Sequence, residues 1–502
     1  MIRLGARELV EAIADPGSHR SWDEPPPPVA EPGSEYAAEL AAARERSGCD
    51  EAVITGEARL RGRRVAFVVS EFRFLAGSIG IATADRIVAA VERATAERIP
   101  LLAAPSSGGT RMQEGTPAFV QMARITAAVM RHRAAGLPYL VYLRHPTTGG
   151  VLASWGSLGH VTVAESGALI GFLGPRVYRA LHGEPFPEGV QVAENLAAKG
   201  VVDAVVDVAD LPELASRALS VLCGETTDEP SGLAADVGAR EEEPAPDLPA
   251  WESIRRSRDP DRPGVRELLK YGATEVSALS GTGEGEADPG LLLALARFGG
   301  VPCVVIGQDR RSQRTGRPLG PAGLRVARRG MRLARELSLP LVTVVDTPGA
   351  VLSAEAEERG LAGEIARCLA ELTALPVPTL GVLLGEGTGG AALALLPADR
   401  VLCARHGWLS PLPPEGASAI VHRTVDRAAE MAQAQGVRSA DLHAAGIVDR
   451  IIPERPDAAA EPKEFCARTA ALVSAELRAL AGTEPDARLA ARHARFAGLP
   501  RR

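Results

Sequence analysis

The sequence has few residues of the kinds that form metal sites, disulfides or catalytic triads. Its 502 residues include six cysteines, at positions 49, 223, 303, 368, 403 and 466, and only nine histidines. No two cysteines stand close enough to form a Cys-x-x-Cys pair, so we expect no metal site in this chain. Cys303 and Cys368 stand among apolar residues, which is typical of buried thiols in a reducing compartment. We therefore expect a cytoplasmic protein without disulfides.

The chain also lacks a large excess of charge and a targeting segment. Acidic residues exceed basic ones by only seven, which provides no general attraction to nucleic acid or anionic lipid. The start, MIRLGARELVEAIADPG, lacks the apolar core of a signal peptide. One weakly charged run, residues 379–398, has membrane-spanning length, but Glu386, several glycines and Pro397 predict a strand, a turn and a helix instead. We expect no nucleic-acid partner and no membrane segment.

What the sequence does contain is an internal repeat. Residues 147–153 read TTGGVLA and residues 387–393 read GTGGAAL, and the two Thr-Gly-Gly steps are separated by 388 − 148 = 240 positions. Residues 100–110, PLLAAPSSGGT, correspond to residues 340–350, PLVTVVDTPGA, at the same separation. Two structural copies of one unit are therefore predicted.

The boundaries between the copies follow from composition. Residues 224–262 are polar, acidic and rich in proline, which predicts a linker between a first domain, 1–223, and a second domain, 263–502. Within each domain, short apolar runs such as VAFVVS and LVTVV alternate with segments of helix length. Strands that alternate with helices predict βαβ units, so both domains are expected to be α/β.

Each Gly-Gly pair stands between a predicted buried strand and a helix of small residues. Glycine lets a ligand oxygen approach the backbone, and the first N–H groups of a helix are free to bind it. A second glycine turn, at 105–110 in one copy and 346–350 in the other, is expected to converge on the first, and two such N–H groups form an oxyanion hole. Tight turns and close helix packing would explain a single Gly-Gly pair as well. The repetition favours anion binding.

Longer motifs around these turns resemble a known enzyme family. Residues 99–176, with SGGTRMQEG, AAGLPYLVYLRHPTTGGVLAS and ESGALIGFLGPR, resemble the β subunit of bacterial acetyl-CoA carboxylase carboxyltransferase. Residues 338–453, with DTPGA, AEERGLAGEIARCLAEL, VLLGEGTGGAALAL and LSPLPPEGASAI, resemble the α subunit. The resemblance suggests a fused β–α carboxyltransferase.

This resemblance implies a fold and a set of site residues. The fold is α/β, with tandem crotonase-like (ClpP-like) β/α superhelix domains. The β-type domain would hold acyl-CoA and polarise its thioester carbonyl, and the α-type domain would hold the ureido oxygen of biotin. In the family the ureido group itself takes the α-proton of the acyl-CoA, so no side-chain base is expected. The residues implied by position are Gly149 and Gly150 with Gly108 and Gly109 on the acyl-CoA side, and Gly389, Gly390 and Ala391 with Gly349 and Ala350 on the biotin side.

The resemblance also implies a reaction and partners. The carboxyl group would pass from carboxybiotin on a separate biotin carboxyl carrier protein to a short acyl-CoA. Acetyl-CoA, giving malonyl-CoA for fatty acid biosynthesis, is the first expectation. A propionyl-CoA carboxyltransferase, an acyl-CoA decarboxylase and a binding or assembly subunit without turnover are the alternatives. A biotin carboxylase is the second partner, and we expect a homodimer or a multiple of one, because in fused members the acyl-CoA site of one chain faces the biotin site of another.

Two motifs resemble nucleotide-binding fingerprints. GEGTGG, residues 385–390, fits the Gly-x-Gly-x-x-Gly pattern of dinucleotide-binding proteins, but Arg405 and His406 stand near the position of the expected acidic ribose ligand. Residues 346–349, DTPG, resemble the Asp-x-x-Gly of GTPases, but no Gly-x-x-x-x-Gly-Lys-Ser/Thr loop precedes them. Neither class is favoured.

Ser154 occupies the place where a ClpP-like protease of this superfold would carry its nucleophile, with His160 or His182 as a possible base. Its counterpart in the second copy is Ala394. Since a small residue stands at both places, we interpret Ser154 as a residue that serves helix packing.

Charged residues near the turns have less specific interpretations. Arg111 and Glu114 follow the first turn, and residues 357–359 (Glu-Glu-Arg) follow the second, so we interpret them as ion pairs that brace the active-site loops. The segment 310–335 is rich in arginine, and several of its arginines share one helical face. A solvated face and a docking surface for coenzyme A phosphates or for the carrier protein both remain open. The arginines are at 310, 311, 314, 317, 325, 328, 329, 332 and 335.

Overall fold

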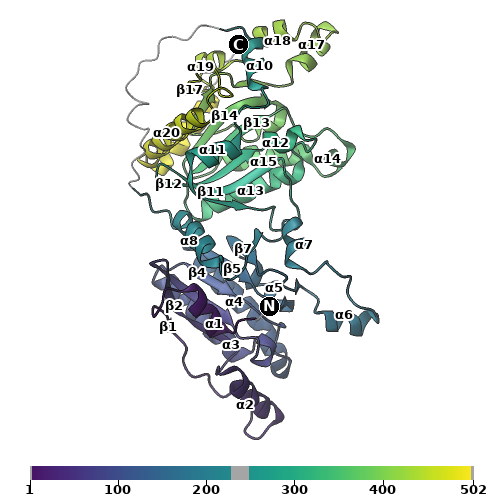
Figure 1. Cartoon of the computed structure of the whole chain (residues 1–502), viewed down its shortest axis with the longest axis vertical. Helices are drawn as coiled ribbons and strands as arrows, with labels where there is room; N and C mark the ends of the chain where they lie inside the picture. The colour runs from purple at the N-terminus through teal and green to yellow at the C-terminus, as the bar shows by residue number, and fades with distance from the viewer. Residues whose placement is uncertain (1–2, 228–247, 499–502) are drawn as a thin grey trace. The chain divides into compact units, whose positions relative to one another are not determined.

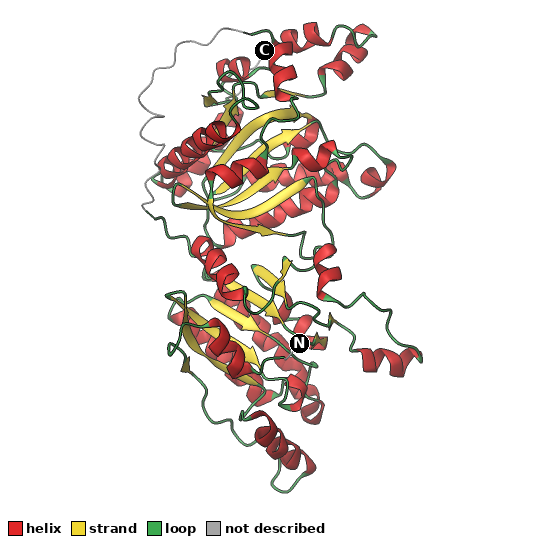
Figure 2. Cartoon of the chain, in the orientation of Figure 1, coloured by secondary structure: helices red, strands yellow, loops and turns green. Residues whose placement is uncertain are grey.

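The computed structural model describes residues 3–227 and 248–498 and divides into two compact units (Figure 1). The first unit comprises residues 1–223 together with 283–286, and the second comprises residues 224–282 and 287–502. Residues 228–247 of the predicted linker lie outside the described residues. In each unit the strands gather into one main sheet with helices packed against it, as Figure 2 shows.

The main sheet of the first unit, within the described residues, has the strand order β1-β2-β3-β4-β5-β7-β9. The pairs β1–β2 and β2–β3 are antiparallel, and the pairs from β3 onward are parallel. Strands β6 and β8 form a separate parallel pair. The strands are β1 (Arg20–Ser21), β2 (Val53–Leu60), β3 (Arg63–Ser70), β4 (Leu101–Ala104), β5 (Tyr139–Leu143), β6 (Thr147–Thr148), β7 (Val161–Ala164), β8 (Ile170–Gly171) and β9 (Ala204–Val205).

The helices of the first unit cover this sheet. Strands β4 and β5 are buried along their whole length, because helices lie on the faces of a parallel sheet. Ile87 and Val91 of α3 and Ile125 of α4 belong to the same apolar core. The helices are α1 (Ala6–Ile13), α2 (Glu35–Ser47), α3 (Ile81–Ala96), α4 (Gly115–Ala134), α5 (Gly149–Leu152), α6 (Pro175–His182), α7 (Ala193–Ala198) and α8 (Leu211–Leu222), with short 3-10 turns η1 (Leu75–Gly77), η2 (Met112–Glu114) and η3 (Trp155–Ser157).

The second unit repeats this sheet with the order β10-β11-β12-β13-β14-β15-β17, and β16 pairs with the end of β14. Strands β10 to β12 pair antiparallel, and the pairs from β12 onward are parallel. Every residue of β12 is buried, as its apolar and β-branched composition favours. The strands are β10 (Thr274–Leu279), β11 (Leu291–Phe298), β12 (Val301–Gln308), β13 (Leu341–Thr347), β14 (Thr379–Thr388), β15 (Arg400–Ala404), β16 (Trp408–Ser410) and β17 (Arg450–Ile452).

The longer helices of the second unit are amphipathic. In α13 the buried face carries Leu324, Ala327 and Met331, at the three- and four-residue spacing of a helix packed on a sheet. The helices are α10 (Ala250–Ser257), α11 (Val265–Gly272), α12 (Arg310–Arg314), α13 (Pro321–Glu336), α14 (Ala354–Glu358), α15 (Leu361–Thr373), α16 (Gly389–Leu393), α17 (Pro414–His422), α18 (Ala428–Gln435), α19 (Ser439–Ala444), α20 (Pro462–Ala481) and α21 (Pro485–Ala497).

The predicted repeat is present in the backbone. Helices α3 and α13 begin and end 240 positions apart (321 − 81 and 336 − 96). The isolated parallel bridge between Ile79 and Thr110 corresponds to the one between Leu319 and Ala350, again at 240 (319 − 79 and 350 − 110). The two units are therefore copies down to single backbone contacts.

The range predicted as a linker contains a packed helix. Residues 250–257, AWESIRRS, form α10, whose Ala250 and Ile254 are fully buried against Trp408, Ala432 and Val437 of the second unit. The predicted range 224–262 therefore differs from the structure at its carboxyl end. The segment is polar overall, but its apolar residues Ala250 and Ile254 stand one helical turn apart. This spacing gives a short amphipathic helix an apolar face that can pack on the second unit.

The weakly charged run at residues 379–398 forms strand β14 and helix α16, as predicted from its glycines and proline. Within the described part of the chain, no helix combines the length and the apolar character needed to cross a bilayer.

Candidate active site

The two glycine turns of the first unit meet. Gly109 and Gly149 both have positive φ, of +110° and +64°, which favours glycine. A Cβ atom placed on Gly109 would lie 3.7 Å from Gly149 Cα and 3.7 Å from Gly150 N. A Cβ on Gly149 would lie 3.5 Å from Gly108 O. The structure thus brings together the four glycines that the resemblance implied for the acyl-CoA side.

The second unit places its glycine turns in the same way. Gly349 and Gly389 have φ of +131° and +66°, and a Cβ on Gly349 would lie 3.9 Å from Thr388 Cγ2, at the residue before the Gly-Gly pair. Ala350 forms the bridge with Leu319 next to Gly349, and Ala391 is fully buried in α16. The implied residues of the biotin side therefore also lie on two neighbouring turns.

A hydroxyl group closes one turn in each unit. Gly109 N donates to Ser107 Oγ at 3.0 Å, and Gly349 N donates to Thr347 Oγ1 at 3.1 Å. Gly108 N donates to Ala76 O at 2.9 Å. These amides are satisfied within the protein, so they shape the turns and are not the free donors of the site.

The amides of the two Gly-Gly pairs differ in their availability. Gly149 N donates to Phe172 O at 3.0 Å and is therefore occupied. Gly150 and Gly390 are the second residues of α5 and α16, where no preceding helical carbonyl is available. Among the described residues neither amide has an acceptor outside its helix. In the first unit the available amide of the pair is therefore that of Gly150, and in the second unit Gly390 N, at the equivalent position, is available as well.

Both of these glycines are enclosed on the side where a Cβ would point. A Cβ on Gly150 would lie 3.4 Å from Met122 Cγ, and a Cβ on Gly390 would lie 2.9 Å from Ile365 Cδ1. Since real Cβ atoms do not approach carbon within 3.0 Å, a Cβ at 390 would require the terminal methyl group of the Ile365 side chain to move.

Charged side chains brace the first turn, as predicted. The guanidinium of Arg111 is fully buried and donates to Glu51 at 2.8 and 2.9 Å, and it lies 3.3 Å from Glu114. Burial by itself would raise the pKa of Glu51, but the hydrogen bonds and charge of Arg111 hold it below its ordinary value. In the second unit the pair after the turn is Arg359 with Glu355, at 3.3 Å and exposed.

A buried ion pair also supports the second unit's turns. Asp346 Oδ2 accepts from Arg310 Nη1 at 3.1 Å, and Asp346 Oδ1 accepts from Glu386 N at 3.1 Å. The side chain of Glu386 is largely buried and receives Arg258 Nε at 2.6 Å. Burial raises the pKa of Glu386 despite this contact. The carboxylate of Asp346 therefore ties the end of β13 to the end of β14.

Three arginines of the arginine-rich segment form ion pairs inside the second unit. Arg325 and Arg328 on α13 form ion pairs with Glu364 of α15 at 3.3 and 3.1 Å, and Arg328 also pairs with Glu371 at 2.6 Å. Arg310 is buried with Asp346. Arg325 and Arg328 therefore serve the interface of α13 with α15, whereas the exposed arginines at 311, 314, 317 and 335 leave the solvated face and the docking surface as predictions.

Ser154 has no arrangement suited to a nucleophile. Its hydroxyl donates to Gly150 O at 2.5 Å, and His160 Nδ1 accepts from Tyr139 N at 3.0 Å. The hydroxyl therefore closes the first turn of α5, and the imidazole supports strand β5.

Sequence reasoning missed two buried amide side chains, Gln308 and Gln313. Both contact the glycine turns of the second unit. A weak signal existed in the polar residue that ends the apolar run CVVIGQ. In the described part of the chain, no group of three or more His, Cys, Asp or Glu is arranged to hold a metal ion.

Comparisons with known proteins identify the family. The carboxyl transferase domain family matches residues 27–488. The chain belongs to this family. This carboxyltransferase is 60% identical over 505 residues, 100% of both chains, to the probable biotin-dependent acyl-coenzyme A carboxylase beta3 subunit of Mycobacterium tuberculosis (strain ATCC 25618 / H37Rv). It is 40% identical over 475 residues, 91% of this chain and 83% of the relative, to the acetyl-coenzyme A carboxylase carboxyl transferase subunits beta/alpha of Salinispora tropica.

Solved structures show the same fold. The carboxyltransferase matches transcarboxylase 12S, with methylmalonyl-coenzyme A and methylmalonic acid bound, at a TM-score of 0.75 and 20% identity, over 96% of this chain and 91% of the other. It also matches a single-chain, multi-domain long-chain acyl-CoA carboxylase at a TM-score of 0.69 and 20% identity, over 93% of this chain and 45% of the other. The tandem crotonase-like α/β fold is confirmed, and so is the class of biotin-dependent acyl-CoA carboxyltransferase. The family shown is that of acyl-CoA carboxylase β subunits, which is broader than the fused acetyl-CoA enzyme suggested by the motifs.

Proposed function

We propose that the chain transfers the carboxyl group of carboxybiotin, carried on a biotin carboxyl carrier protein, to a short acyl-CoA. The first unit, 1–223, is the acyl-CoA side and the second, from residue 263 onward, is the biotin side. The observation that carries this proposal is the matched pair of glycine turns, in which the amides of Gly150 and Gly390 are available at equivalent positions.

In this proposal each amide stabilises one oxygen. Gly150 N–H donates to the thioester carbonyl of the acyl-CoA and stabilises the negative charge that develops there when the α-proton leaves. Gly390 N–H donates to the ureido oxygen of biotin, and Ala391 contributes to the same turn. Carboxybiotin supplies the carboxyl group and the ureido base. The main chain thus provides polarisation, and no histidine or carboxylate is needed as a base.

The fit of biotin to the second unit rests on the donor that its two glycine turns, at 346–350 and 389–390, present. Gly390 presents an uncharged N–H beside a turn closed by Thr347, and a Cβ would fill the space at Ile365. A neutral oxygen acceptor such as a ureido carbonyl matches one amide donor.

We infer acetyl-CoA as the leading substrate and propionyl-CoA as the next. Relatives named acetyl-coenzyme A carboxylase support the first, and the 60% identical relative named for acyl-coenzyme A supports a broader acyl group. Decarboxylation of a malonyl-type CoA on the same site remains the rival reaction, because it passes through the same enolate.

The test uses the reverse half-reaction. The purified chain is incubated with malonyl-CoA or methylmalonyl-CoA, with and without free biotin, and acyl-CoA release is measured. Release that depends on biotin supports carboxyl transfer, and the faster donor identifies the acyl group. Equal release without biotin indicates a decarboxylase, and no release with either donor, with or without the carrier protein, would contradict both.

We also propose a homodimer or a multiple of one, with the biotin carboxyl carrier protein and a biotin carboxylase as partners in a reducing cytoplasm. Size measurement in solution together with activity tests this, since a fully active monomer would contradict it.

A further inference from the structure

Gln308, the last residue of β12, bridges both glycine turns of the second unit. Its side chain is fully buried. Its Oε1 accepts from Asp346 N at 3.0 Å, and its Nε2 donates to Ala391 O at 2.7 Å. A backbone N–H can only donate and a carbonyl can only accept, so the two partners fix the orientation of the amide group. One side chain therefore joins the start of the 346–350 turn to helix α16.

The contact with Ala391 gives a donor to a backbone carbonyl that helix α16 itself leaves without one. In a longer helix the carbonyl of Ala391 would accept from Leu395 N, but Leu395 N donates to Ala392 O at 3.2 Å instead. Helix α16 thus ends before its Ala391 carbonyl gains a helical partner. The amide of Gln308 supplies the missing donor and holds the turn that carries the Gly390 amide.

Gln313 on α12 holds the other turn. Its Nε2 donates to Asp346 O at 3.2 Å, and its Oε1 accepts from Thr347 Oγ1 at 2.6 Å. This contact is shorter than the 3.0 Å between Thr347 Oγ1 and Gly349 O, so we assign the single hydroxyl proton to Gln313. The oxygen lone pairs of Thr347 then accept from Gly349 N at 3.1 Å. Gln313 therefore sets the hydroxyl that closes the turn.

The first unit has no carboxamide side chain at the position equivalent to Gln308. Ser70 is the strand position equivalent to Gln308, because β2 and β3 pair in the same register as β11 and β12, 238 positions earlier (308 − 70). Its buried Oγ has no hydrogen-bond partner among the described residues. The hydroxyl that closes the first unit's turn, Ser107 Oγ, donates to Gly77 O at 2.6 Å. The bridging amides are a property of the second unit alone.

We propose that Gln308 and Gln313 are positioning residues that hold the two glycine turns of the biotin side in register. The proposal rests on the proposed function of these turns. Its physical basis is that the Gly390 amide stands on a five-residue helix that cannot fix its own orientation, and donors of an oxyanion hole act only when held in place before the reaction. The carboxamides, rather than the helix, supply that rigidity.

The test replaces Gln308 with methionine, which has a similar volume and makes no hydrogen bond. For Gln308→Met we expect hydrogen–deuterium exchange to accelerate in peptides covering 346–351 and 387–394, and to stay unchanged in peptides covering 107–110 and 148–152. We expect kcat for biotin-dependent release of acyl-CoA from malonyl-CoA to fall by about tenfold or more, with KM for malonyl-CoA within about twofold of the wild type. A purely structural role would instead accelerate exchange in the peptides of both units and change both kcat and KM.

Gln308→Glu refines the result, because its carboxylate still accepts from Asp346 N but no longer donates to Ala391 O. We expect faster exchange in 387–394 but not in 346–351. Ser70→Ala is the matched control at the equivalent strand position, and it should change neither exchange nor turnover. If Gln308→Met does not fold, Gln313→Met tests the same proposal through 346–351.

The outcomes separate this proposal from the proposed function. If the wild type releases no acyl-CoA in response to biotin, the proposed function fails, and exchange alone decides whether the amides hold the turns. If Gln308→Met shows wild-type exchange in both peptides and wild-type kcat, the positioning role is wrong while the proposed function stands.

Discussion

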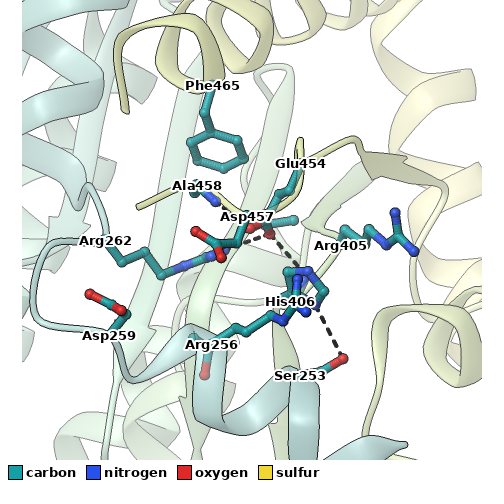
Figure 3. A network of polar contacts seen from close by, with 12 residues as sticks. Ser253, Arg256, Asp259, Arg262, Arg405, His406, Glu454, Asp457, Ala458 and Phe465 are labelled. Atoms are coloured by element: carbon teal, nitrogen blue, oxygen red, sulfur yellow. Dashed lines mark hydrogen bonds and ion pairs between the residues drawn. The ribbon is translucent and has the colours of Figure 1, made fainter. Parts of the chain in front are cut away.

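Arg262 donates through both of its terminal nitrogens to the two carboxylate oxygens of Glu454, at 2.6 and 2.7 Å, with both side chains fully buried (Figure 3). Arg262 lies between helices α10 and α11, and Glu454 lies just after strand β17. Glu454 also accepts from His406 N at 2.9 Å, and the His406 ring contacts Ser253 Oγ on α10 at 3.3 Å. The pair therefore joins the connection between α10 and α11 to β17, the last strand in the order of the second unit's sheet.

Breaking this pair will destabilise the second unit. Arg262→Met leaves the carboxylate of Glu454 buried without its partner, and we expect the free energy of unfolding to fall by about 3–5 kcal/mol. The double variant Arg262→Met/Glu454→Leu should recover part of that loss, because it removes the unpaired charge but leaves His406 N and Ala458 N without their acceptor. Urea denaturation of the three proteins measures the difference. Equal losses in the single and double variants would show that the ion pair is not what matters.

The glycines that carry the available amides should not tolerate a larger residue. Gly390→Val brings a side chain against Ile365, and Gly150→Val does so against Met122. We expect each to reduce kcat for carboxyl transfer because the added side chain shifts the N–H donor, with a loss of up to roughly 10²–10³-fold, the value for complete removal of one oxyanion donor. The steady-state rate with malonyl-CoA and biotin measures this. Gly416→Ala, whose added Cβ meets nothing within 4 Å, is the control and should keep wild-type activity.

Ser154 should be dispensable for chemistry. Ser154→Ala removes the hydrogen bond to Gly150 O and is expected to cost about 1 kcal/mol of stability, with turnover within a few-fold of the wild type. Turnover and thermal unfolding of this variant check both expectations. Complete loss of turnover in a folded protein would instead support a nucleophilic serine.

Acid should destabilise the first unit through His132. This ring is fully buried between Thr95 Oγ1 at 3.0 Å and Pro138 O at 3.3 Å, and burial lowers its pKa from 6.5 to about 4. Above pH 6.5 the ring is neutral in both the folded and the unfolded state, so it has no effect. Between pH 6.5 and 4 only the unfolded state takes up the proton, and stability falls by up to about 3 kcal/mol.

The unfolding free energy measured between pH 7 and 4 tests this prediction. The variant His132→Gln should show a smaller loss over that range than the wild type. An identical pH profile in the variant would contradict the role of His132.

Much of the fold followed from patterns that are local in sequence. The 240-residue repeat, the alternation of apolar runs with helical segments and the strand–turn–helix at residues 379–398 depend on residue types and spacing, which act through local propensity and burial. The glycine pairs at 149–150 and 389–390 were recognisable for the same reason, because positive φ at Gly149 and Gly389 is a local demand of the turn.

The choice of hydrogen-bond partners depended on the tertiary structure. Gly149 N is occupied by Phe172 O, 23 positions along the chain (172 − 149), and Gln308 joins two turns that the sequence separates from it by 38 and 83 positions (346 − 308 and 391 − 308). The arginines of α13 meet glutamates of α15 for the same reason, and α10 docks on Trp408 although its composition is polar.

The sequence by itself determined the duplicated α/β fold and where its glycine turns stand. Only the folded chain decided which amide of each turn stays available and which side chains hold it. A hydrogen bond requires two atoms within about 3 Å, and the pleat and register of a parallel sheet, not the order of residues, bring such atoms together.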